Sequence, residues 1–468
     1  MMAVSWKRAA GIAMRILILL LPVCPVSAQK TTIYSLADLV DSANRHLPLL
    51  LEKQALVQSA QAGITEARDA FLPKVNVVEE LSVGSANDLT GPFLPVPGVL
   101  HSIAGSINSA SDYQAVTGNL ASVYGEYELV NFGLRGAKVA SAKAFAGWTQ
   151  ADLERERYQV KWEIGRIYFE ILKNRNLLSV DEENIRRYES MYEISRALTS
   201  TGVNPGVDSS LARAGLSRTR VNLNEATGSL RRLQLQMAYL TGIAAPDIAM
   251  DTTRRIDAVS VYGLLGDTVA AINNPLAEYF ARQKLQYSAQ QLLARKSYLP
   301  KIVLGAGGWA RGSSIQYSNV YESPGEGLGY QRLNYLAGVG ITYDLFNGVH
   351  KRDRVAVLDR QVAAADYALQ QQQLSLHNQE LQADESIRTA RANLTELPLQ
   401  LQAATDAYNQ KLAQYKAGII NLVDLSNASF ELFQAQSSYI QTLNEWYTAS
   451  LDKAAATGHL DLFIQTVK

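Results

Sequence analysis

The chain repeats a set of short landmarks at a nearly fixed distance, which restricts it to a fold built from two similar halves. Each landmark lies at a border between a strand-like and a helix-like segment. The matched pairs are Phe71–Val75 with Tyr298–Ile302, Tyr127–Asn131 with Tyr343–Asn347, and Gly202, Val207, Asp208 and Ala212 with Gly418, Val423, Asp424 and Ala428. Subtraction of the residue numbers gives a shift of 227 for the first pair and 216 for the others. A duplicated unit of this size is an architectural repeat.

The first residues have the composition of an export signal. Basic residues precede a short apolar run at 16–21, and small residues follow at 26–28. This order predicts a signal peptide over residues 1–28 that is removed from the mature protein. The apolar run is too short to cross a bilayer as a helix.

Cys24 is the only cysteine of the chain, and it falls within this expected leader. Lipid modification of Cys24 stays open as an alternative to plain cleavage after residue 28. Otherwise the mature chain has no cysteine, which excludes a disulfide scaffold, a thiolate metal site and a cysteine nucleophile.

The charge balance and the scattered histidines exclude further classes of protein. The 44 Lys and Arg residues balance 44 Asp and Glu residues, so no overall field favours nucleic acid. The five histidines lack metal-ligand spacing, and the sequence has neither a GxSxG motif nor a paired nucleophile and base. We therefore expect no enzyme, no cofactor, no metal site and no nucleic-acid partner.

Helix-like and strand-like patterns alternate along the first half of the mature chain. The predicted elements are a helix over 35–70, strands near 74–83 and 113–130, a long helix over 134–199 and a helix over 207–240. Ser35 is the expected N-cap of the first helix, and Asp38 supplies the carboxylate of a capping box. Pro48 interrupts this helix and Pro73 ends it.

The second half repeats the same series. The predicted elements are a helix over 264–297 interrupted at Pro275, strands over 301–311 and 333–345, a very long helix over 349–415 and a last helix over 422–456. Each half therefore holds one β-hairpin, at 74–131 and at 301–346. Loops are expected between the strands, at about 87–112 and 313–332.

Four strands with no cover for the sheet edges cannot close a barrel within one chain. No run of about eighteen apolar residues follows the leader, so any membrane-spanning part must be built from strands. A strand of about twelve residues tilted by ~45° spans roughly 28 Å, which suits an outer membrane. Several chains would have to pool their strands, with the long helices reaching on the order of 100 Å beyond them. A soluble β-sandwich edge and a periplasmic coiled-coil stalk are the open alternatives.

The order and spacing of these landmarks resemble the TolC family of outer-membrane efflux proteins over nearly the whole mature chain. The motifs are Leu-Pro-Lys where a helix passes into a strand, Tyr-x-Leu-x-Asn where a strand passes into a helix, and two GxxxxVDxxxA turns. The resemblance implies a TolC-like fold, a membrane β-barrel continued by a long α-helical barrel, with four strands per chain and twelve in a homotrimer. Residues 29–250 and 251–468 are then the two repeats.

The same resemblance implies a function and a set of partners. The chain would be the exit duct of a tripartite efflux system in the outer membrane of a Gram-negative bacterium, in contact with its lipid. It would dock to a periplasmic adaptor and an inner-membrane pump, which supplies the energy, and it would bind no cofactor. The family also serves type I protein secretion, which stays open as the alternative function. The sequence does not reveal the substrate.

The resemblance places a periplasmic tip at the two turns that contain Gly202 and Gly418, where an adaptor would dock. It also implies a gate near the second turn, with Tyr415 and Asp424 at positions that match the family. Asn427 stands where a second acidic residue is expected, and Ile420 replaces an expected basic one.

Asp424 also has a simpler interpretation that needs no gate. Three copies of Asp424 around a three-fold axis would repel one another and favour cations. Alternatively, Asn421 and Asp424 form a helix N-cap arrangement, with the acid next to the positive end of the helix. Both interpretations stay open for Asp424, whereas for Asp208 the cap is favoured over the gate.

Overall fold

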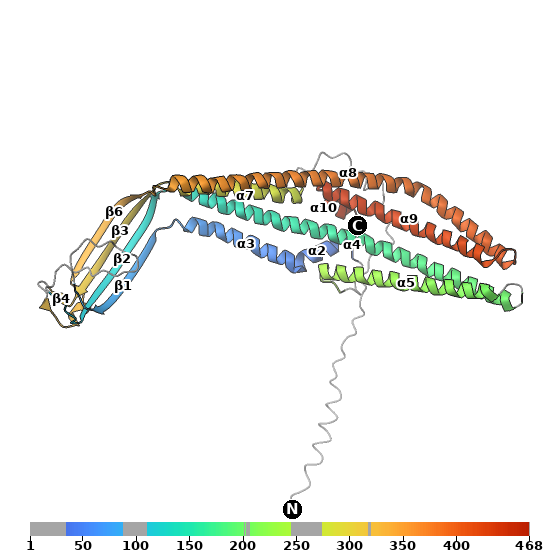
Figure 1. Ribbon diagram of the computed structural model, residues 1–468, viewed down its shortest axis with the longest axis horizontal. Coiled ribbons are helices and arrows are strands. Elements are labelled where there is room, and N and C mark those ends of the chain that lie inside the picture. The colour runs from blue at the N-terminus through green and yellow to red at the C-terminus, as the bar shows by residue number, and fades with distance from the viewer. Residues whose placement is uncertain are drawn as a thin grey trace, which may run out of the picture.

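A computed structural model describes residues 34–87, 110–200, 202, 206–244, 274–316 and 320–467. Figure 1 shows an elongated molecule, with a sheet at one end and long helices that run away from it to two tight turns at the other end. The expected signal peptide, Cys24, the boundary between the repeats near residue 250 and most of the first hairpin loop lie outside the described residues.

The predicted first helix is two helices. α2 spans Leu36–His46 and α3 spans Pro48–Asp69. Leu47 between them is extended, with φ −70° and ψ 116°, because the residue before a proline is kept out of the helical region. The capping box is present as predicted: Ser35 accepts from the amide of Asp38, and the Asp38 side chain accepts from the amide of Ser35.

The long helices match the sequence predictions to within a few residues, except that the helix predicted over 264–297 is described only from Pro275, since 264–273 lie outside the described residues. They are α4 (Leu134–Ser200), α5 (Gly206–Thr241), α7 (Pro275–Ser297), α8 (Asn347–Lys416) and α9 (Leu422–Thr457). α4 has 67 residues and α8 has 70, so each is roughly 100 Å long. A short helix that the sequence did not predict, α10 (Leu460–Thr466), follows α9. None of the described helices is long and apolar enough to cross a membrane.

The sheet has the order β1-β2-β3-β6, and every neighbouring pair is antiparallel. Its strands are β1 (Lys74–Gly84), β2 (Val116–Val130), β3 (Lys301–Ser313) and β6 (Arg332–Thr342). The two hairpins of the duplication therefore lie side by side, joined through β2 and β3. All the residues of both edge strands are exposed.

The second hairpin differs from the prediction in two places. The strand predicted to reach residue 345 ends at Thr342, because Asp344 accepts from the amide of Phe346 and begins a turn. The predicted loop at 313–332 contains structure of its own: β4 (Ile315–Gln316), β5 (Val320–Tyr321) and a 3-10 turn over Glu326–Leu328.

The helices are held together by two buried clusters. The larger one lies where α2, α4, α5, α9 and α10 meet, and Phe169 at its centre packs on Tyr447 and Phe463. The second cluster lies close to the two turns and contains the buried residues Met191, Ala212, Tyr408, Tyr415, Leu422, Leu425 and Leu432. Each fully buried side chain of this kind stabilises its helix by about 1.5–3 kcal/mol. The far end of the molecule is therefore a packed four-helix tip.

Candidate functional site

The turn between α8 and α9 is a tight glycine turn. Gly418 has φ +72°, a backbone conformation that is strained for residues that have a side chain and open to glycine. The amide of Gly418 donates to the carbonyl of Tyr415, and the amide of Ile419 donates to that of Gln414. These two bonds satisfy carbonyls that the end of α8 leaves free, the pattern of a Schellman motif.

The turn between α4 and α5 repeats this geometry. Gly202 has φ +76°, and its amide donates to the carbonyl of Thr199. Both glycines named from the sequence thus occupy the left-handed position that ends a helix. Figure 1 shows the two turns next to each other at the end of the molecule farthest from the sheet.

The side chains that follow Gly418 divide between capping and exposure. Asn421 is the N-cap of α9, and its Oδ1 atom accepts from the amide of Asp424 at 2.9 Å. The side chain that caps α9 is therefore that of Asn421. The Asp424 side chain lies exposed in the first turn of the helix. Asn427 is exposed one turn later. The structure leaves the Asp424 side chain free to face a pore or a partner.

Asp208 occupies the same position of α5 in a different environment. It lies in the first turn of its helix, but only 7% of its surface is exposed. Asp208 therefore belongs to the packed end of the helix, whereas Asp424 belongs to the surface. The two acids that the duplication relates are not equivalent in the folded chain.

Tyr415 is fully buried inside the tip of its own protomer. Its ring belongs to the second cluster, and its hydroxyl has no hydrogen-bond partner among the described residues. The structure therefore brings Tyr415 and Asp208 into the packed tip, and leaves Gly418, Asp424 and Asn427 on its surface.

The tip also exposes apolar side chains that the sequence analysis did not treat as functional. Ile419 in the second turn is 72% exposed, and Val207 and Val423 at the starts of α5 and α9 are 58% and 52% exposed. Val207 and Val423 correspond in the duplication. The sequence held a signal for this surface, namely apolar residues at matched positions of the two turns. Glycine and an N-cap residue are enough to form such a turn, so exposed apolar side chains there indicate a contact with a partner.

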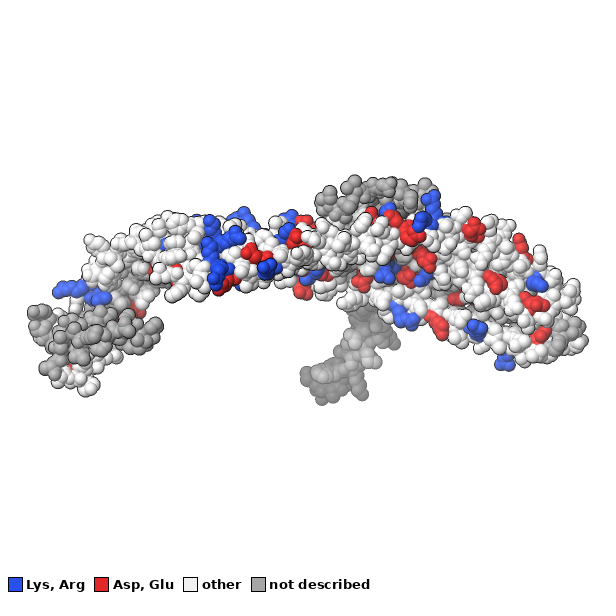
Figure 2. Space-filling view, turned by 45° about the horizontal axis from the view of Figure 1, so that its top comes forward, with Lys and Arg blue, Asp and Glu red and all other residues white. Residues whose placement is uncertain are grey.

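A half-buried polar contact joins α4 to α9 between the two clusters. Arg187 donates to the Oε1 atom of Gln436 at 3.1 Å, with Glu183 at 3.9 Å. Burial lowers the pKa of Arg187 and raises the pKa of the buried Asp181 carboxyl nearby on the same helix. Farther out, Figure 2 shows acidic and basic side chains intermixed along the helices, which agrees with the balanced charge of the chain.

The edge strands of the sheet carry apolar residues on one shared face. The pairing register places Val77, Val123, Gly308 and Tyr335 in one row across all four strands. Since alternate residues share a face, the exposed Val75, Val77, Leu81 and Val83 of β1 lie on the same face as Leu333, Tyr335, Val339 and Ile341 of β6. The opposite face carries more charge: in the row of Glu80, Leu120, Arg311 and Arg332, three of the four residues are charged.

Comparison with known proteins gives the same architecture. A family model described as outer membrane efflux protein matches residues 39–243 and 271–459, one segment in each half of the duplication. Protein CyaE of Bordetella pertussis is 24% identical over 449 residues, which is 93% of this chain and 86% of that protein. The cobalt-zinc-cadmium resistance protein CzcC of Cupriavidus metallidurans is 23% identical over 325 residues, which is 68% of this chain and 72% of that protein.

Solved structures show the same fold at low identity. The outer membrane protein VceC of Vibrio cholerae superposes with a TM-score of 0.72 and 14% identity, over 90% of this chain and 96% of that one. The fold is thus that of a TolC-like outer-membrane channel, as the sequence predicted. The chain belongs to the outer membrane efflux protein family, and it is an outer-membrane exit duct of the tripartite efflux class.

Proposed function

We propose that three copies of the chain form one duct, in which the sheets pool twelve strands in the outer membrane of a Gram-negative bacterium. The observation that carries this proposal is the state of the sheet, in which both β1 and β6 are exposed along their whole length. An open edge with unpaired backbone groups is not tolerated in lipid, so each edge needs a strand from another copy. The apolar face of the sheet then meets the hydrocarbon.

The helices offer matching surfaces for the same assembly. On α8, the exposed Tyr367, Leu374 and Leu381 recur at seven-residue spacing. On α5, the exposed Val221 and Leu235 lie at twice that spacing. Apolar residues at heptad spacing are the seams by which helices pack into coiled coils. These stripes suit contacts between protomers in a helical tube that crosses the periplasm.

The tip is the proposed docking point for a periplasmic adaptor, through which an inner-membrane pump delivers cargo. Support comes from the exposed Ile419, Val207 and Val423 and from the glycine turns, where backbone can approach a partner closely. Asp424 is proposed to line the entrance, since its carboxylate is exposed beside Gly418. Tyr415 and Asp208 would contribute by holding the packed tip.

The proposed cargo is a small solute, and the name of the cobalt-zinc-cadmium resistance relative points to export of cations. Type I protein secretion is the competing function, since one duct serves both. Deletion of the gene should sensitise cells to small toxic solutes. If deletion instead leaves such resistance intact and a secreted protein accumulates inside the cell, the secretion alternative holds.

Photocrosslinking from the tip tests the docking proposal. A photoreactive residue at Val423 should capture the adaptor, and the same residue at Val357, an exposed position of α8 close to the sheet, should not. Gly418→Leu should abolish capture while the trimer still forms, because the strain is confined to the turn. Loss of the trimer in Gly418→Leu would mean that the glycine serves assembly only.

A further inference from the structure

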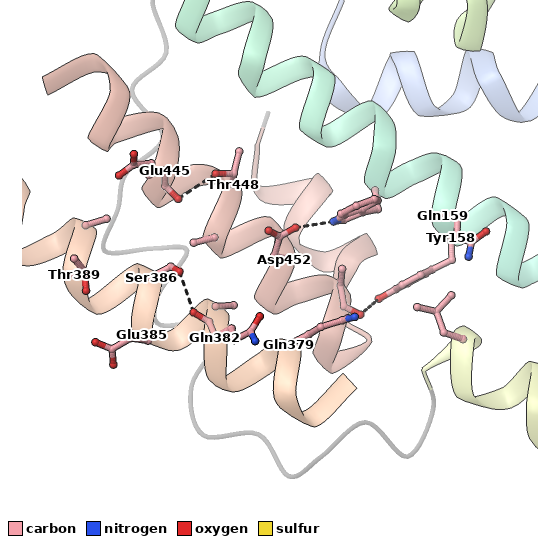
Figure 3. A pocket seen from close by; sticks show the side chains of 16 residues that line it. Tyr158, Gln159, Gln379, Gln382, Glu385, Ser386, Thr389, Glu445, Thr448 and Asp452 are labelled. Atoms are coloured by element: carbon pink, nitrogen blue, oxygen red, sulfur yellow. Dashed lines mark hydrogen bonds between the residues drawn. The ribbon is translucent and has the colours of Figure 1, made fainter. Parts of the chain in front are cut away.

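A large hollow opens between the helices in the middle of the molecule. It has a volume of about 950 Å³ and is lined mainly by α4, α8 and α9 (Figure 3). This size lies within the range of sites that take small organic molecules. One wall is aromatic, formed by Tyr158 and Trp162 of α4. Figure 3 shows Asp452 of α9 on the side toward Tyr158, and Glu445 and Glu385 on facing helices toward the other end.

The charged residues that line this hollow are all acidic. Asp452, Glu445 and Glu385 contribute three carboxylates, and none of the described residues that line the hollow is Lys or Arg. Glu385 is paired with Arg388 outside the lining. Asp452 is held in place by Trp162, whose Nε1 atom donates to its Oδ1 atom at 2.7 Å, so one carboxylate oxygen is left to face a guest. The polar residues beside them are uncharged amides and hydroxyls.

The internal duplication supplies a natural reference for this hollow. A second hollow of about 600 Å³ lies between α4 and α5 at the corresponding place in the first half. Subtracting 216 relates Gln382 to Arg166 and Asp452 to Gln236, and these residues line the two hollows at matched positions. The hollow of the first half thus has a base, Arg166, where that of the second half has an amide, Gln382. It has an amide, Gln236, where that of the second half has an acid, Asp452.

Trp162 lines both hollows, and in the first half its ring already carries a cation. The guanidinium of Arg166 lies 4.9 Å from the centre of the indole ring. A cation over an indole face is stabilised by about 0.5–2 kcal/mol, more where water is excluded. In the second half an amide, Gln382, stands at the matching position, and of the three carboxylates only Glu385 has a basic partner, Arg388. The hollow between α4, α8 and α9 therefore combines aromatic rings with negative charge, and none of its described lining residues is a base.

We propose that this hollow binds small organic cations with an apolar body, and so is a binding station for substrates of the duct. The apolar body lies against Tyr158 and Trp162, and the positive group faces Asp452, with Glu445 toward the other end of the hollow. A metal ion fits less well, since the described residues contain no group of three His, Cys, Asp or Glu side chains able to hold one. The proposal deepens the proposed efflux function and rests on it.

Calorimetric titration with tetraphenylphosphonium tests the proposal on the full-length trimer in lipid nanodiscs. Wild type should bind the cation above the level of empty nanodiscs and should not bind the neutral triphenylphosphine oxide. Asp452→Asn keeps an acceptor for Trp162 but removes the charge, and should weaken binding at least tenfold. Gln382→Arg should abolish it, because the new guanidinium occupies the hollow as a tethered cation. The matched control is Glu163→Gln in the first half, which should bind as wild type does.

The outcomes separate this proposal from the proposed function. Trimers that form normally but bind the cation equally in wild type, Asp452→Asn and Gln382→Arg would overturn the site and leave the duct intact. Binding of Zn²⁺ without tetraphenylphosphonium would also overturn it. So would a cysteine placed at Thr448 that a maleimide cannot reach in the trimer, because a second copy would then cover the hollow. Failure of the wild-type chain to form trimers would instead refute the proposed function.

Discussion

The two tip turns have the same backbone and different surfaces. Gly202 and Gly418 both end a long helix in the left-handed conformation, at +76° and +72°. Six residues later, Asp208 is buried in the first repeat and Asp424 is exposed in the second. The duplication thus preserves what the backbone requires and lets side chains diverge. Where the copies agree they describe the architecture, and where they disagree they point to function.

The largest expected difference between the copies lies just before the turns. Tyr415→Ala removes a fully buried ring from the second cluster and should destabilise the tip by about 3–5 kcal/mol. The matched change in the first repeat, Thr199→Ala, should alter stability by about 0.5 kcal/mol or less. Hydrogen exchange of the amides at the ends of α8 and α9 measures the effect.

Tyr415→Phe is the control for this prediction. The Tyr415 hydroxyl has no partner among the described residues, so removing it should leave the stability of the tip unchanged or raise it. Faster exchange in Tyr415→Phe would show that the hydroxyl makes a bond that matters, for example in a gate. That result would contradict a role for Tyr415 in packing alone.

The next largest difference in stability is expected between the N-caps of α7 and α2. Asn274 caps α7 through the amide of Leu276, and its own side-chain amide donates to the carbonyls of Ala455 and Ala456 at the end of α9. Asn274→Ala should cost about 2–4 kcal/mol, because it removes a cap and both side-chain hydrogen bonds to the end of α9, although the Tyr158 hydroxyl still donates to the Ala455 carbonyl. Ser35→Ala, at an exposed cap, should cost about 1 kcal/mol. Thermal unfolding of the two variants gives the comparison.

The Ser35 cap also predicts a dependence on pH. The side-chain and backbone hydrogen bonds from Ser35 lower the pKa of Asp38. A carboxyl with a lowered folded pKa stabilises the protein above its ordinary pKa, about 3.9, and loses this contribution as the pH falls through the folded pKa. The stability gap between wild type and Ser35→Ala should therefore shrink between about pH 5 and pH 3. A gap that stays constant over this range would rule out the carboxylate as its source.

The smallest effect on stability is expected at Asp424. Asp424→Asn should change the free energy of unfolding by about 0.5 kcal/mol or less, since the side chain is exposed. It should nevertheless lower the cation preference of single channels in planar bilayers, whereas Asp208→Asn should not. Equal cation preference in wild type and Asp424→Asn would exclude a pore-lining role for this acid.

Much of this fold could be predicted because its signals are local. Glycine and proline mark the turns, Ser35 and Asp38 mark a helix start, and helical composition fixes the limits of α4 and α8. The short α10 carries no separate signal, because seven residues are too few for a periodic pattern. The sequence predicted that Pro48 interrupts one helix. The structure shows that Pro48 divides it into two helices, with an extended residue, Leu47, between them.

The contents of the sites were harder to predict, because they depend on which helices meet. The burial of Tyr415 follows from its packing on residues of α4, α5 and α9, which are distant in sequence. The hollow beside Trp162 joins residues almost 300 positions apart. A position-by-position comparison of the two repeats, such as Arg166 against Gln382, held a signal for it, but only the structure shows that these positions line hollows.

The central claim is that the bare edges of the sheet are completed by other copies of the chain. Because Cys24 is the only cysteine and lies in the expected leader, cysteines placed in the strands report without background. Val339→Cys in β6 should be combined in turn with Val75→Cys, Val77→Cys and Leu81→Cys in β1, which share its face of the sheet. Oxidation of outer membranes should give covalent dimers and trimers with one of these pairs. The variants that carry a single cysteine should give none. Folded, membrane-inserted protein that forms no link between chains with any pair would contradict the claim.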